Sequence, residues 1–183
     1  MRLFWGVLFC LSILSVSVSA ETLGGGKGGP FIQYNTTSLS AFDSQMAGNP
    51  LIIGGIGFGW ASKKFRIGGG GGGGFLWSGS ESAQFGIGYG GMVGEYIIAD
   101  WLLARMMIGG GGFSVSKIVS ETATILEVQR IASGGFLLFH PQVVADIKIG
   151  QWASLGFSIG YFVPNIARLH SMSFSIQLMF GRI

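Results

Sequence analysis

The residues of this chain best suited to bind a metal or to move protons are its two histidines, His140 and His170. A zinc site needs three or four ligands in convergent positions, and neither histidine has further ligands at a metal-binding spacing. His140 falls within an expected strand, and His170 falls in an expected connection between strands. These residues therefore predict no metal site, no cofactor site and no catalytic residue.

The segment Arg168–Ser173 has the arrangement closest to that of a nucleophilic site. Its His170, followed by serines, resembles the His/Ser arrangement of outer-membrane lipid A deacylases, and this resemblance implies a lipid-modifying enzyme. A serine nucleophile also needs a base that an acidic group orients. Gln177, downstream on the same strand face, is not acidic, and Asp146 and Glu127 are far away in sequence. We therefore expect no enzyme, with a lipid-modifying outer-membrane enzyme as the minor alternative.

Two glycine-rich segments match nucleotide-binding motifs only by accident. Gly86–Gly91 fits the pattern G-x-G-x-x-G, but it lies within an expected strand and no helix follows it. Gly24–Gly29 lacks the Ser or Thr that follows the lysine of a phosphate-binding loop. Neither segment predicts a nucleotide site.

Residues 1–20 predict a secretory signal peptide. Arg2 supplies a positive charge, Leu3–Leu14 is apolar, and Val18 and Ala20 precede a plausible cleavage site. A membrane-anchoring helix is the alternative, but the apolar run is shorter than the ~20 residues that span a bilayer. We expect an exported protein.

The expected mature chain, residues 21–183, is a single domain with little charge. Its formal net charge falls from +3 to +2 with the loss of Arg2, and its basic residues form no cluster, so we expect no nucleic-acid partner. The one cysteine, Cys10, is lost with the signal, which excludes disulfides and thiolate metal sites. Charged residues make up 10% of the chain, against about 25% in an average soluble domain.

Glycine alternates with large apolar residues along much of the chain, as in Phe85–Gly90 and Leu155–Tyr161. A period of two predicts β-strands, whose side chains point to opposite faces. Because the bare face carries glycine and serine instead of charge, we expect that the bulky face does not meet water. No apolar run after the signal is long enough for a transmembrane helix, which favours a transmembrane β-barrel. An unusually apolar, self-assembling soluble β-protein is the alternative.

The pattern predicts an all-β fold, an antiparallel up-and-down meander that closes into a small barrel of about eight strands. The expected strands cover residues 30–36, 51–60, 65–77, 83–98, 101–117, 136–148, 152–162 and 172–181. The connections after the odd-numbered strands are the longer ones, including a long polar stretch over Ile118–Gly135. We therefore expect both termini at the end with the short turns. One short helix is expected over Ser38–Ala47, where apolar residues share a face before Gly48 and Pro50.

Aromatic residues lie at the ends of the expected strands, which is typical of the girdles of membrane barrels. The tryptophans concerned are Trp60, Trp77, Trp101 and Trp152. In the last strand, large apolar residues from Phe174 to Phe180 alternate with Ser173, Ser175 and Gln177. This strand resembles the C-terminal strand of bacterial outer-membrane proteins. Over most of its mature length, the chain resembles the broad class of outer-membrane β-barrel proteins.

The glycines cluster in four consecutive expected strands, which are neighbours in a meander. They are Gly54, Gly55, Gly57 and Gly59; Gly68–Gly74; Gly86, Gly88, Gly90, Gly91 and Gly94; and Gly109–Gly112. One hypothesis is that the helix Ser38–Ala47 lays its apolar face on this smooth patch. The alternative is that the glycines only allow the bending that closes a small barrel.

Few charged residues fall inside the expected strands. Asp146 and Lys148 share the face opposite Val143 and Ile147, which predicts that both point into the barrel. Glu95 and Arg105 fall on the more apolar parity of their strands, so we expect them at a rim or beyond a bulge.

These observations predict an exported β-barrel protein of the outer membrane, with the lipid bilayer as its partner. We expect a structural or envelope-interaction role without catalysis, and no general porin activity, because eight strands enclose too narrow a space. The alternative is a soluble periplasmic or cell-surface β-protein that binds an apolar ligand or associates with itself. The protein partner or apolar ligand is not determined by the sequence.

Overall fold

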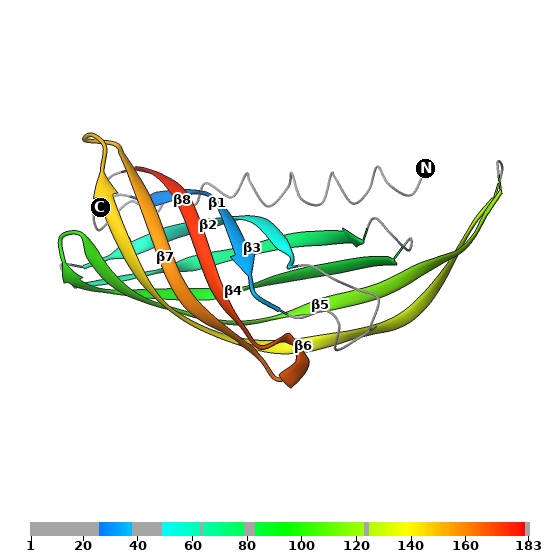
Figure 1. Ribbon diagram of the computed structural model, residues 1–183. Helices are drawn as coiled ribbons and strands as arrows, with labels where there is room; N and C mark the ends of the chain where they lie inside the picture. Colours follow the sequence, from blue (N-terminus) through cyan, green and yellow to red (C-terminus); the bar gives the residue numbers. More distant parts are fainter. Residues whose placement is uncertain (1–25, 38–48, 63, 79–82, 123–124, 182–183) are drawn as a thin grey trace.

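The computed structural model describes residues 26–37, 49–62, 64–78, 83–122 and 125–181, which form a closed antiparallel barrel (Figure 1). Its elements are β1 (Lys27–Asn35), β2 (Leu51–Ala61), β3 (Phe65–Ser78), β4 (Ala83–Ala99), β5 (Leu102–Thr122), β6 (Ile125–Lys148), β7 (Ala153–Pro164), the 3-10 turn η2 (Ala167–Leu169) and β8 (Ser171–Gly181). Each strand pairs with its neighbours in sequence, and β1 pairs with β8 to close the barrel. The predicted eight-stranded meander is therefore confirmed.

The pairing of β1 with β8 also places the two ends of the barrel chain. Lys27 pairs with Gly181, and Asn35 pairs with Ser173. The barrel therefore begins and finishes at the same end, the one with the short turns, as the sequence predicts. We call it the turn end. β1 begins at Lys27 instead of Pro30, because Lys27 and Gly28 already pair with both β2 and β8.

The prediction of a long polar loop over Ile118–Gly135 is wrong. β5 continues to Thr122 and β6 begins at Ile125, and these two residues pair at the tip of a hairpin. Figure 1 shows this two-stranded ribbon projecting beyond the rest of the barrel, and we call that end the hairpin end. Ile, Val and Thr recur through the segment and favour strands, while its polar residues suit a ribbon that leaves the barrel.

Two other expectations fall on parts of the chain that are not described. The expected helix Ser38–Ala47 lies outside the described residues, and so does the expected signal peptide, residues 1–20. In the part of the chain that the structure describes, no helix is long and apolar enough to cross a membrane.

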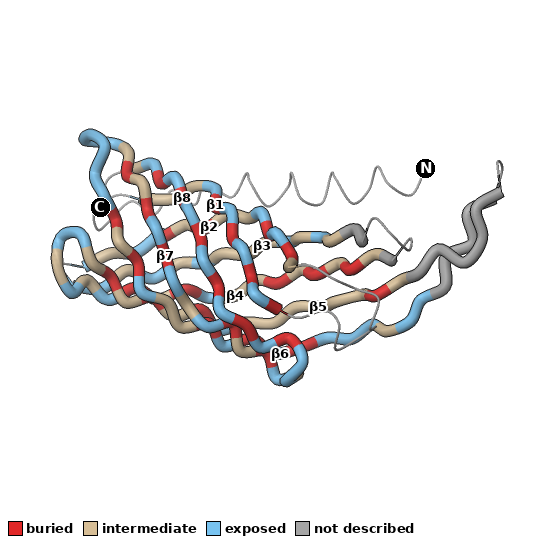
Figure 2. Tube along the Cα trace, viewed as in Figure 1, coloured by how far each residue is buried: buried red, intermediate tan, exposed pale blue. Residues whose placement is uncertain are grey.

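Side chains alternate between the inside and the outside of the barrel along each strand. β8 shows the alternation throughout, with Ser173, Ser175 and Gln177 buried and Phe174 and Ile176 exposed. Figure 2 shows the same alternation along β7 and β8 on the near side of the barrel. Along most of β7 and β8 the bulky face therefore points away from the interior, a choice that the sequence left open.

In β4 the bulky face points the other way, into the interior. The bulky residues Phe85, Ile87 and Tyr89 are buried inside, and the glycines between them face outward. The reason lies in the neighbouring strand, because Ile87 pairs with Gly74 and Tyr89 pairs with Gly72. The interior wall of β3 carries no side chains at these positions, so the large side chains of β4 fill the space.

The apolar core runs along the interior, and its members include Phe58 and Met179 toward the turn end. Toward the hairpin end, the ring of Phe162 lies 5.3 Å from that of Tyr89 and 6.1 Å from that of Phe136. Leu169 of η2 is also buried in this cluster. The interior is thus packed with side chains at this level, as expected for a barrel of eight strands.

Candidate functional site

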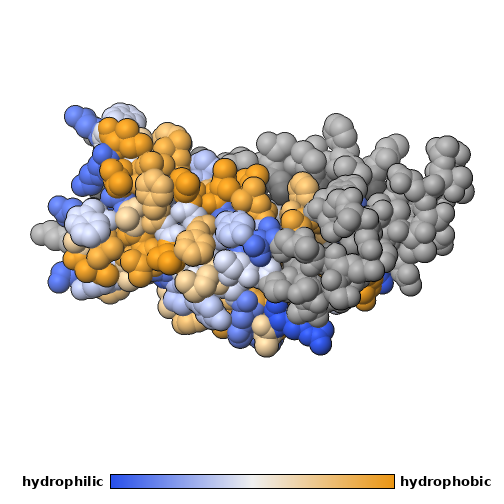
Figure 3. All heavy atoms as spheres, in the orientation of Figure 1, coloured by the Kyte–Doolittle hydropathy of each residue, from blue (hydrophilic) through white to orange (hydrophobic). Residues whose placement is uncertain are grey.

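The outer wall of the barrel is covered by exposed apolar side chains. They come from every strand, for example Ile32, Ile53, Ile67, Met92, Ile108, Val143, Ile159 and Ile176. Figure 3 shows apolar side chains gathered as a broad surface over the strand region of the face in view. A contiguous apolar surface of this extent on a closed barrel, with polar groups inside, is the arrangement of a membrane-spanning barrel.

Aromatic side chains border this surface at both ends. At the turn end, Trp60, Trp101 and Trp152 are all exposed, and Phe65 lies with its ring 5.0 Å from that of Tyr96. At the hairpin end, Tyr34, Phe75 and Tyr161 are exposed. The predicted positions of Trp60, Trp101 and Trp152 at the ends of strands are confirmed, and such positions are typical of aromatic girdles. Trp77 lies near the end of β3, and its side chain is outside the description.

The glycines that face inward are required by the packing of the barrel. A Cβ on Gly68 would overlap the carbonyl of Gly57, and one on Gly109 would overlap the carbonyl of Gly90. A Cβ on Gly72 would lie 3.1 Å from the ring of Phe31. These glycines allow tight curvature and make room for large side chains, which supports the bending hypothesis.

Some of the glycines that face outward have room around them, whereas a Cβ on the outward-facing Gly71 would lie 2.6 Å from the carbonyl of Tyr89. A Cβ on Gly57 or Gly59 would meet nothing within 4 Å, and one on Gly69 would meet only ordinary contacts, at 3.5 Å. The barrel itself therefore does not require glycine at positions 57, 59 and 69. The docking of the helix Ser38–Ala47 on this outer patch stays a prediction, because that segment is not described.

Charged side chains meet inside the barrel toward the turn end. Arg105 donates to Glu95 Oε1 from Nε at 2.7 Å and from Nη2 at 2.5 Å. Its Nη1 donates to Gln177 Oε1 at 2.7 Å, across the interior. Arg66 donates from Nη1 to the other oxygen of Glu95, at 3.3 Å. A buried carboxylate is thus paired with two guanidinium groups, which offsets the cost of removing the three charges from water.

A second carboxylate extends this cluster. Asp146 Oδ2 accepts a hydrogen bond from Lys27 Nζ at 2.6 Å, and Arg66 Nη1 lies 3.9 Å from the same oxygen. Arg66 therefore lies between Glu95 and Asp146. The cluster joins side chains of β1, β3, β4, β5, β6 and β8, so it ties opposite walls of the barrel together.

The predicted positions of the charged residues are confirmed in one case and wrong in three. Asp146 is buried inside, as expected, whereas Lys148 is exposed because it is the last residue of β6 at the rim. Glu95 and Arg105 were expected at a rim or beyond a bulge, but both are buried in the interior. The inward faces of β4 and β5 carry both apolar and charged residues. For this reason, the apolar residues on the same strand faces as Glu95 and Arg105 did not indicate that these two charged residues point into the barrel.

His170 and the serines that follow it do not form the nucleophilic arrangement that was the minor alternative for Arg168–Ser173. His170 Nε2 bonds to the Pro164 carbonyl at 2.8 Å, and the Ser171 hydroxyl makes no hydrogen bond within the described residues. Ser173 instead contacts His140, with 2.7 Å between Ser173 Oγ and His140 Nε2. Gln142 Nε2 lies 3.0 Å from His140 Nδ1, where a catalytic triad would need a carboxylate.

The His140–Ser173 pair is part of the packed interior. His140 has no exposed surface, and its ring packs edge-on against Phe162 at 5.4 Å. In the described part of the chain, no three or more His, Cys, Asp or Glu residues are grouped as metal ligands. The contact of His140 with Ser173 was missed because the two residues are 33 positions apart and lie on β6 and β8, which meet only through their pairing with β7.

The closed eight-stranded meander and apolar wall define the fold class of small outer-membrane β-barrel proteins. No family model matches the chain, and no curated protein matches its sequence. Among solved structures, the chain is similar to Ail, the attachment invasion locus protein of Yersinia pestis, with a TM-score of 0.57 and 9% identity, over 87% of this chain and 97% of Ail. It is also similar to the N-terminal β-barrel domain of Pseudomonas aeruginosa OprF, with a TM-score of 0.51 and 8% identity, over 87% of this chain and 99% of that domain. These similarities agree with an outer-membrane location.

Proposed function

We propose that this chain is an exported outer-membrane protein with a structural or envelope-interaction role and no catalytic activity. The observation that carries the proposal is the apolar outer wall, bordered by aromatic residues and backed by a polar, side-chain-filled interior. Such a wall is stable in a bilayer and would promote aggregation in water. Residues 1–20 would direct export, leaving residues 21–183 as one barrel domain.

The β5–β6 hairpin supports the interaction part of this proposal. It extends past the last residues that pair with β4 and β7, at Lys117 and Leu138. A protein that only filled space in the bilayer would not need strands of this length, since a transmembrane strand takes about 9–11 residues. The hairpin is therefore our candidate surface for a partner outside the membrane.

Cell fractionation tests the proposal. We expect the protein in the outer-membrane fraction and expect unheated samples to migrate differently from heated samples on a gel, because a closed barrel resists detergent until it is heated. Recovery from the periplasm without detergent would overturn the membrane location and favour a soluble β-protein that binds an apolar ligand or itself.

A further inference from the structure

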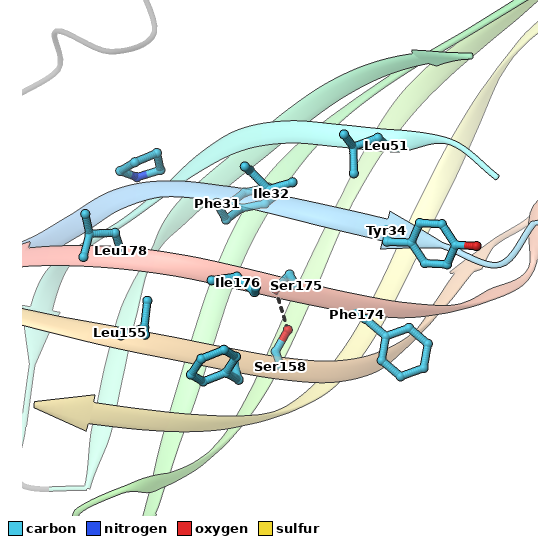
Figure 4. A pocket seen from close by; sticks show the side chains of 12 residues that line it. Phe31, Ile32, Tyr34, Leu51, Leu155, Ser158, Phe174, Ser175, Ile176 and Leu178 are labelled. Carbon is cyan, nitrogen blue, oxygen red and sulfur yellow. Dashed lines mark hydrogen bonds between the residues drawn. The ribbon is translucent and has the colours of Figure 1, made fainter. Parts of the chain in front are cut away.

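An apolar groove crosses the outer wall where β1 and β8 close the barrel. It has a volume of about 590 Å³ and is lined by residues of β1, β2, β7 and β8. Figure 4 shows Ile32 and Ile176 near its middle, Leu155 and Leu178 toward one end, and Tyr34 toward the other. The volume falls within the range of pockets that hold small ligands, ~300–1,000 Å³.

The lining of the groove suits a hydrocarbon. Ile32 and Ile176 expose 52% and 54% of their surfaces, and the other outward side chains around them are also apolar or aromatic. The two hydroxyls nearby, of Ser158 and Ser175, are 2.6 Å apart and bond to each other, as Figure 4 shows. The groove therefore offers little hydrogen bonding to a polar ligand.

The length and ends of the groove match one leaflet of a bilayer. Phe174 and Leu178 both line it, and this separation corresponds to about 13 Å along β8 at ~3.3 Å per residue. Half of a hydrocarbon core ~30 Å thick is about 15 Å. At the hairpin end, the Tyr34 hydroxyl accepts a hydrogen bond from Asn49 Nδ2, which puts polar groups where a headgroup would begin.

We propose that this groove binds one hydrocarbon chain of a membrane lipid from the leaflet at the hairpin end, with the headgroup beside the Tyr34–Asn49 pair. The proposal rests on the membrane location proposed above, because the groove is continuous with the apolar wall that contacts the bilayer. It adds a defined binding site to that wall, so that one lipid is retained when the others exchange for detergent.

Native mass spectrometry tests this site. The full mature barrel is refolded in detergent micelles with dimyristoylphosphatidylcholine, and the lipid that stays bound is counted. We expect one lipid per wild-type barrel. Ile176→Trp fills the middle of the groove and should reduce retention at least tenfold. Ile108→Trp, the same substitution at an exposed position on β5, should retain the lipid as the wild type does.

The result depends on folding, which the heat-dependent gel shift reports on the same samples. If Ile176→Trp does not fold, Ile32→Trp on β1 replaces it. The site is overturned if the folded wild type retains no lipid, or if the groove variants retain as much as Ile108→Trp. A dimer that Ile176→Trp abolishes would instead assign the groove to a second copy. Failure of the membrane location would appear separately, as a protein that is soluble without detergent.

Discussion

Arg105 places its guanidinium against one oxygen of Glu95 inside the barrel, at 2.5 Å from Nη2 and 2.7 Å from Nε. The two residues face each other directly in the pairing of β4 with β5. Arg66, which faces Glu95 from β3, binds its second oxygen. One carboxylate thus joins three neighbouring strands, and removal of its charge should be costly.

Glu95→Gln should therefore destabilise the barrel strongly. The substitution leaves Arg105 and Arg66 without their shared anion, and breaking a buried ion pair costs about 3–5 kcal/mol. We expect the urea midpoint of unfolding from lipid vesicles to fall accordingly. Asp100→Asn, at an exposed turn residue, is the control and should leave the midpoint unchanged. Equal midpoints for the two variants would show that the interior pair contributes little.

Two adjacent glycines of β3 should differ in how much stability the barrel loses when each is replaced by alanine. Gly68→Ala places a methyl group against the backbone of Gly57 and Phe58, and overpacking costs about 1–3 kcal/mol. Gly69→Ala places it on the outer wall, with ordinary contact at 3.5 Å to the Gly91 carbonyl, so we expect little loss of stability. Unfolding in urea compares the pair. A larger loss for Gly69→Ala would contradict the assignment of the inner face.

A charged side chain on the outer wall should lower the stability of the barrel more, the deeper it lies in the bilayer. Ile159 lies within β7 and Ile149 lies in the turn after β6, with 46% and 63% of their surfaces exposed. Arginine costs about 2–4 kcal/mol at the midplane of a bilayer and about 0–1 kcal/mol near the interface. We expect Ile159→Arg to lower the stability of the barrel in vesicles much more than Ile149→Arg. Similar effects would indicate that the wall does not span a bilayer.

Overproduction of the wild-type protein should leave the lipid A of the cell unchanged. His140 and Ser173 are buried and have a glutamine where a triad has an acid, and His170 is bonded to a backbone carbonyl. Mass spectrometry of extracted lipid A, against cells with an empty vector, makes the comparison. A new lipid A species that His140→Ala or His170→Ala removes would establish an enzyme.

The packed interior should also prevent general diffusion through the barrel. Phe162 and Tyr89 fill it toward the hairpin end, and the Arg105 cluster crosses it toward the turn end. We expect proteoliposomes that contain the protein to swell no faster in a small sugar than empty liposomes do. Fast swelling would show that these side chains leave an open path.

The sequence alone determined the number of strands, their order and the low charge of the chain. It did so because alternation with a period of two and the turn residues are local properties. It also predicted the tryptophans at the strand ends and the two contrasting faces of β8. These features depend on one strand at a time, so no knowledge of its neighbours was needed.

Only the tertiary structure decided which face of β4 and β5 points inward and which residues meet there. A period of two defines two faces but not which one is inside, and in β4 the answer depended on the glycines of β3. The contacts of Arg105 with Gln177 and of His140 with Ser173 join residues far apart in sequence. The pairing of the strands brings them together, because the register of the strands sets which side chains share one level of the interior.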